Sequence, residues 1–113
     1  MVILEEYLKT LTGNHLDNLL SDYQNVIIYD TDKDIKTGLL RYSHSPVNTA
    51  FLFKMPKEKV LTFHTVGMKF PIKIFFFNSK KEIVYSYGEV SPGIDHITSK
   101  RPAKYVVEIP INE

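Results

Sequence analysis

From Asn25 onward the chain is a series of short apolar segments separated by turn-forming residues, and this spacing limits the fold more than any other feature. The segments are VIIYD (26–30), AFLF (50–53), VLTF (60–63), KFPIKIFFF (69–77), EIVYSY (82–87) and KYVVEI (104–109). Proline, glycine, asparagine and serine mark the connections at 45–46, 55–57, 78–81, 91–93 and 100–102. We therefore predict a mainly β protein of six to eight short strands, a compact antiparallel sandwich or barrel with parallel pairing disfavoured.

The segment 69–77 shows most clearly how a strand would sit in this fold. Side chains alternate between the two faces of a strand, which gives one wholly apolar face, Phe70, Ile72, Ile74 and Phe76. The other face starts with cations and ends with aromatic rings, in the order Lys69, Pro71, Lys73, Phe75 and Phe77. The four residues 78–81 then suit a connection to 82–87, so residues 70–87 form the predicted hairpin.

The first 23 residues have a helical pattern in place of a strand pattern. Leucines recur at helical spacing on either side of Gly13, at positions 4, 8 and 11 and again at 16, 19 and 20. We expect one or two short helices within residues 1–23, an extension that packs on a β core of residues 25–110 in a single domain spanning 1–113. Its apolar stripe would cover the aromatic end of the segment 69–77, at Phe75 and Phe77.

The composition narrows the classes of protein. The 113 residues include no cysteine, which excludes disulfides, thiolate zinc sites and a cysteine nucleophile. No apolar run reaches the length of a membrane span, and Glu5 and Glu6 stand where a secretory signal carries positive charge. We expect a soluble, cytoplasmic protein.

The residues that carry chemistry show no catalytic pattern. The chain lacks a G-x-S-x-G elbow and a phosphate-binding glycine loop, and no two acids stand on an obviously apolar background that would raise the pKa of one of them. His64 and Met68 would share one face of a strand, but we interpret them as a strand-end hydrogen-bonding residue and a core side chain in preference to a soft metal site. We expect no catalytic residue, metal or cofactor, while an enzyme of unknown reaction stays open.

The uneven distribution of charge along the chain indicates a protein that binds a ligand or a partner. Residues 1–37 carry seven acids and three lysines, whereas residues 38–113 carry eleven cations and six acids. We predict a binding or accessory module whose site gathers at the entrance of the segment 69–77, from Arg41, His64, Met68, Lys69 and Lys73. Its partner would be an anionic small molecule or an acidic protein surface. A single-stranded nucleic acid is the alternative, held by Tyr85 and Tyr87 with the lysines of the same hairpin.

Several segments in a fixed order carry a resemblance to a known family. GLLR (38–41), AFLF (50–53), HTVGMKFPI (64–72) and AKYVVE (103–108) resemble the prokaryotic family named domain of unknown function 192, over about residues 25–110. The resemblance implies a compact, mainly antiparallel β fold related to jelly-roll sandwiches and brings no assigned activity. Lys73 stands where the family usually has Asp, Asn78 replaces a frequent acid, and residues 111–113 replace a common glycine turn.

Overall fold

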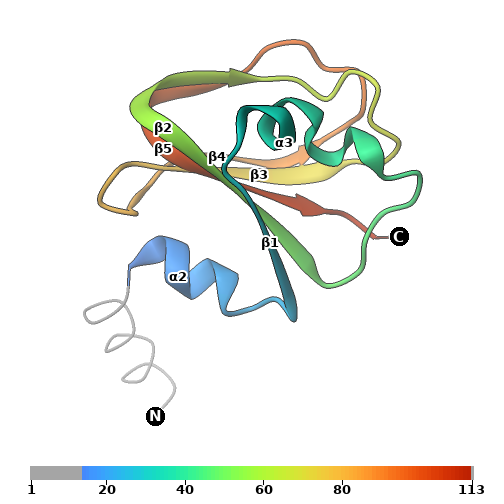
Figure 1. Cartoon of the computed structure of the whole chain (residues 1–113), viewed down its shortest axis with the longest axis horizontal. Helices are drawn as coiled ribbons and strands as arrows, with labels where there is room; N and C mark the ends of the chain where they lie inside the picture. The colour runs from blue at the N-terminus through green and yellow to red at the C-terminus, as the bar shows by residue number, and fades with distance from the viewer. Residues whose placement is uncertain (1–13, 113) are drawn as a thin grey trace.

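One mixed sheet of five strands organises residues 14–112, the part of the chain that this computed structural model describes (Figure 1). In chain order the elements are α2 (His15–Leu20), β1 (Asn25–Tyr29), α3 (Asp32–Thr37), the 3-10 helix η1 (Gly38–Arg41), β2 (Thr49–Phe63), β3 (Ile72–Phe77), β4 (Ile83–Val90) and β5 (Ile97–Pro110). The strands are ordered β1-β2-β5-β3-β4. None of the helices described is long and apolar enough to cross a membrane.

The two long strands, β2 and β5, give the sheet its shape. They pair antiparallel from Phe51 opposite Glu108 to Phe63 opposite Ile97, with register shifts along the way. Figure 1 shows both strands curling together at one end, so that their far halves turn over the face of the sheet. β1 and β4 remain the two edges, and no pairing among the described residues closes the sheet into a barrel.

The predicted turns at 55–57 and 100–102 are wrong, because both lie inside these long strands. Each coincides with an irregularity of the β2–β5 ladder. Lys100 has a φ of +61°, and the buried Ser99 hydroxyl accepts a hydrogen bond from the Leu61 N–H (2.9 Å) and donates one to the Arg101 carbonyl (2.6 Å). The chain thus bends at a bulge without leaving the sheet, which reduces the expected six to eight strands to five. The jelly-roll arrangement is not confirmed.

A parallel pair, which the sequence disfavoured, joins β1 to β2. The crossover between them contains α3 and η1, which together span only ten residues. Thr31 caps α3, its hydroxyl accepting a hydrogen bond from the Asp34 N–H (3.2 Å), and Asp32 adds negative charge to the first turn. The helix is too short to show an apolar stripe in the sequence, so the prediction of a purely antiparallel sheet missed it.

The sheet buries a core on each face. The concave face holds the larger core, which includes Phe51, Phe53, Leu61, Ile72, Ile74, Phe76 and Val106. The alternation predicted for 69–77 is confirmed: Phe70, Ile72, Ile74 and Phe76 are all buried, whereas Lys69 and Lys73 are exposed. The strand itself begins at Ile72, not Lys69, and its antiparallel pairing with β4 confirms the hairpin.

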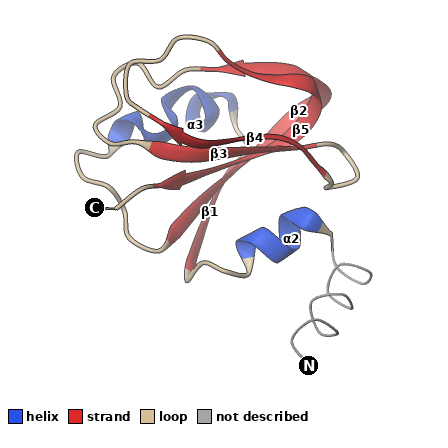
Figure 2. Ribbon diagram, turned by 180° about the vertical axis from the view of Figure 1, so that it is seen from behind, coloured by secondary structure: helices blue, strands red, loops and turns tan. Residues whose placement is uncertain are grey.

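The smaller core lies on the outer face, beneath α2. Leu16 packs there with Leu52, Phe77 and Val107, and Figure 2 shows α2 and α3 on opposite sides of the sheet. The start of α2 is tied to the β3–β4 hairpin, since the His15 Nδ1 accepts a hydrogen bond from the Ile83 N–H (2.9 Å). The helix predicted around residues 4–11 lies outside the described residues.

We expect Leu16→Ala to lower the free energy of unfolding by about 3 kcal/mol, because it leaves a cavity between α2 and the sheet. Urea denaturation measures the change. Val47→Ala is the matched control, since Val47 is 71% exposed and its truncation should change stability by less than about 0.5 kcal/mol. Equal effects of the two substitutions would show that α2 does not pack as described.

Candidate functional site

A pocket of about 360 Å³ opens on the concave side of the sheet, between the α3–η1 segment and the end of β2. Its walls are mostly apolar, formed by Ile35, Leu39, Leu40, Phe53, Met55, Phe63 and Met68. Lys36 and His64 also line it, and both are exposed to solvent. The lining also includes Thr37, Gly38 and Thr62, and one carboxyl, that of Glu108 on β5. A concave apolar site with a few polar groups is the usual form of a small-molecule pocket.

Glu108 reaches the pocket because of its register on β5. It pairs with Phe51 of β2 on one side and with Ile74 of β3 on the other. Val106, two residues earlier, belongs to the same concave core. The acid is therefore surrounded along and across the sheet by apolar side chains, and only 4% of its surface is exposed.

The surroundings of Glu108 favour its neutral form. Within residues 14–112 its carboxyl makes no hydrogen bond and no ion pair. Transfer of a charged carboxylate from water into such a setting is unfavourable, and burial raises the pKa of the Glu108 carboxyl to about 8. At pH 7 the protonated acid predominates, a group that donates one hydrogen bond and accepts others.

The loop after β2 holds the other polar side of the pocket in place. Thr65, which is 1% exposed, donates a hydrogen bond from its hydroxyl to the Ser91 carbonyl (2.7 Å) and accepts one from the Ile94 N–H (3.0 Å). Gly67 has a φ of +88°, and a Cβ there would lie 3.1 Å from the Leu40 side chain. The HTVGM sequence is thus the fixed support that presents His64 and Met68 to the pocket.

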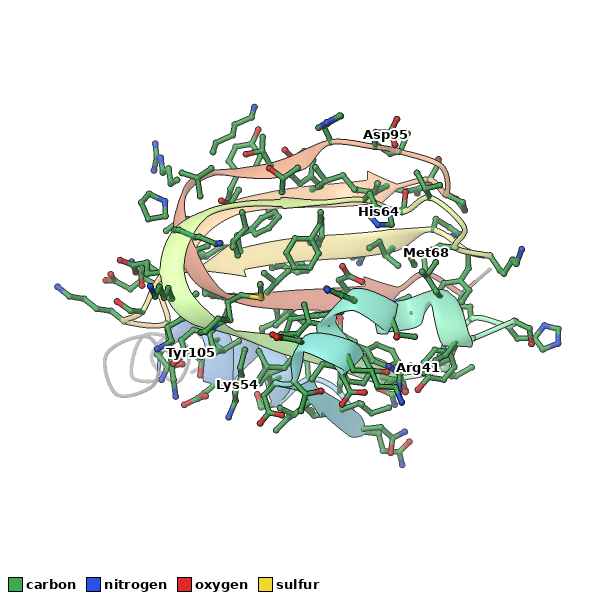
Figure 3. The ribbon with its side chains drawn as sticks, turned by 45° about the horizontal axis from the view of Figure 1, so that its top comes forward. Arg41, Lys54, His64, Met68, Asp95 and Tyr105 are labelled. Carbon is green, nitrogen blue, oxygen red and sulfur yellow. The ribbon has the colours of Figure 1, made fainter. Side chains whose placement is uncertain are left out.

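The structure brings together only part of the site predicted from sequence. His64 and Met68 line the same pocket, and Figure 3 shows them on one side of the α3–η1 segment with Arg41 on the other. Arg41 lies 4.6 Å above the Tyr29 ring and 3.4 Å from an Asp34 oxygen.

The two predicted lysines do not line this pocket. Lys69 is exposed in the connection that precedes β3. Lys73 lies on the outer face of the sheet, where it lines a separate hollow of about 270 Å³ with Tyr23 and Ile109. Cations on opposite faces of a sheet cannot meet one small ligand, so the pocket is defined by other residues.

Glu108 is the residue that sequence reasoning missed. The expectation concerned paired acids, and Glu108 is a single acid, flanked on β5 by the buried Val107 and Ile109. The signal was an acid inside an apolar strand segment, at the end of the AKYVVE sequence. Among the described residues no group of three or more His, Asp or Glu side chains is placed to hold a metal ion.

The raised pKa of Glu108 predicts a stability that falls as the pH rises. The folded carboxyl binds its proton more tightly than the unfolded one, so its favourable contribution is complete below about pH 4 and is lost as the pH passes 8. The loss is on the order of 5 kcal/mol for a pKa moved from 4.5 to about 8. Urea denaturation at a series of pH values measures it.

The substitution Glu108→Gln should remove this part of the pH dependence while keeping the size of the side chain. Glu89→Gln is the matched control, because Glu89 is exposed on β4 and should leave the pH profile as it is. If the Glu108→Gln protein kept the wild-type slope between pH 5 and 8, the carboxyl would not titrate as described.

Comparisons with known proteins agree with the resemblance noted in the sequence. A comparison with curated proteins gives no match. A crystal structure from Sinorhizobium meliloti 1021, described as a "putative transcription regulator", superposes with a TM-score of 0.68 at 19% identity, over 75% of this chain and 67% of that one. A protein of unknown function from Novosphingobium aromaticivorans DSM 12444 gives a TM-score of 0.69 at 16% identity, over 75% of this chain and 61% of that one.

These likenesses show the shared fold, and the chain spans less than two thirds of the second structure. A family model identifies the chain more directly, because it matches residues 18–113, nearly the whole sequence and every described strand. The protein belongs to the DUF192 family, domain of unknown function 192, described as Uncharacterized ACR.

Proposed function

We propose that the protein is a binding module that takes a small molecule with a largely apolar body into the pocket lined by Glu108. The observation that supports this most is the pocket itself, an apolar space of about 360 Å³ with a single buried carboxyl. A wall built only for stability would not include an unpaired acid, since a buried unpaired acid lowers stability.

Binding is favoured over catalysis by what the lining contains. Among the described residues that line the pocket, the titratable side chains are those of Glu108, His64 and Lys36, and the hydroxyls are those of Thr37 and Thr62. An activated nucleophile is recognised by a hydrogen bond to its general base, and no hydrogen bond among the described residues joins two of these side chains. His64 uses its Nδ1 to accept a hydrogen bond from the Val66 N–H (3.2 Å), an interaction that orients the ring.

The ligands suggested by the sequence fit this pocket less well. An anionic molecule would have to leave its charge at the solvent side, near Lys36 and His64, because Glu108 occupies the buried end. The Sinorhizobium protein is described as a "putative transcription regulator", but α2 and α3 here are six residues each with aspartate in the first turn. Such helices suit neither a DNA groove nor phosphates.

A neutral dye whose fluorescence rises in apolar surroundings, N-phenyl-1-naphthylamine, should bind the protein saturably. Leu40→Trp should weaken this binding roughly tenfold, because Leu40 lines the pocket and a larger ring there fills the space that the dye needs. Leu40 is 42% exposed, so the substitution does not overpack the core.

Val47→Trp is the control, the same new ring at a position 71% exposed and outside the pocket lining. Circular dichroism and thermal unfolding establish that both variants fold. Absence of saturable binding to the wild-type protein, or equal affinity for the Leu40→Trp and Val47→Trp proteins, would contradict a ligand in this pocket.

A further inference from the structure

We propose that the ligand of this pocket carries a protonated amine on its small apolar body, and that the Glu108 carboxylate is the counter-ion of that amine. The inference rests on the proposed function and names the chemical class of the ligand. It is drawn from the position of one unpaired acid and from the groups around it.

The first step is that the protein supplies no partner to Glu108. Its side chain is 4% exposed and lines the pocket, and within residues 14–112 its carboxyl forms neither a hydrogen bond nor an ion pair. Buried polar groups in folded proteins are almost always paired. An unpaired carboxyl that faces a pocket is therefore a position for a partner from outside the chain.

The second step concerns the charge of that partner. The rings of Phe53 and Phe63, which pack edge to face at 5.6 Å, line the pocket together with Glu108 and the thioether of Met68. Aromatic faces attract cations, and a carboxylate forms its shortest and strongest hydrogen bonds with cationic donors. Acid and aromatic rings together favour an ammonium group over a neutral or anionic one.

The third step is the position of the other charged groups. Lys36 and His64 are the remaining titratable side chains of the lining, and both are exposed. Solvent screens their repulsion of a cation at the buried end. The arginine of the crossover, Arg41, does not line the pocket, since its guanidinium lies over the Tyr29 ring and beside Asp34. No cation of the described residues competes for Glu108.

The fourth step is the balance of protons. At pH 7 Glu108 is mostly protonated, because burial raises its pKa to about 8, whereas an alkylamine is already protonated like a lysine. When the ammonium enters, the neutral acid releases its proton to solvent and the two charges form a pair. Binding at pH 7 should therefore release close to one proton for each amine bound, and the release should decline toward zero as the pH approaches 9.

Isothermal titration calorimetry tests the inference with three pairs of probes that differ only in the polar group. These are phenethylamine with 2-phenylethanol, cyclohexylmethylamine with cyclohexylmethanol, and hexylamine with hexanol. We expect at least one amine to bind roughly tenfold or more tightly than its alcohol. Repetition in two buffers of different ionisation enthalpy gives the number of protons released.

Glu108→Gln should abolish both the preference for the amine and the proton release, while the affinity for the alcohol stays within about twofold of wild type. Glu89→Gln should change neither. Proton release by the wild-type protein tests the role of the acid without any variant, should Glu108→Gln fail to fold.

The inference would be overturned if the alcohols bound the wild-type protein as tightly as their amines. It would also be overturned if the Glu108→Gln protein still preferred the amine and released no proton. Either result would leave the proposed function standing. If neither the amines nor the alcohols bind, and N-phenyl-1-naphthylamine does not bind either, both the inference and the proposed function are wrong.

Discussion

The antiparallel pairing of β2 with β5 is the interaction on which the rest of the structure depends. These two strands form the centre of the sheet, and every other strand pairs with one of them or with β3 beside them. Their bend at the bulge held by Ser99 turns the far half of the pair over the concave face. Without that bend, Phe63 and the loop from His64 to Met68 would point away from α3. The pocket would then keep the wall formed by the α3–η1 segment and lose the wall formed by the end of β2.

The same pairing places an acid, Glu108, in a buried position where a charged side chain does not stabilise the fold. Glu108 lies on the central strand between Phe51 and Ile74, so it has no route to solvent other than the pocket. Substitution of a buried ionisable group by an apolar one is often neutral or stabilising. A protein under no constraint but stability would therefore have little use for a carboxyl here, and this connects the energetics of β5 with the proposal that the acid meets a ligand.

The predictions from sequence were most accurate where one periodic pattern, such as the alternation of side chains along a strand, applies to several residues in a row. The alternation of Phe70, Ile72, Ile74 and Phe76 correctly gave the buried face of β3, because every side chain in that segment follows the same rule. It failed where a residue that normally ends a strand is tolerated at a bulge, as at Pro56 and Pro102. The pocket was harder still: His64 and Met68 line it, but it depends on the approach in space of Leu39, Phe53 and Glu108, which lie far apart in the sequence.

The outer face explains why Glu108 cannot simply turn away. Side chains of a strand alternate, so a rotation or slip of β5 by one residue would exchange the two faces. Val107 and Ile109 would then leave the core beneath α2, and Glu108 would replace them against Leu16 and Phe77. That exchange moves the acid from an open pocket into a closed core. The helix on the outer face therefore fixes the register that holds the carboxyl in the pocket on the other side.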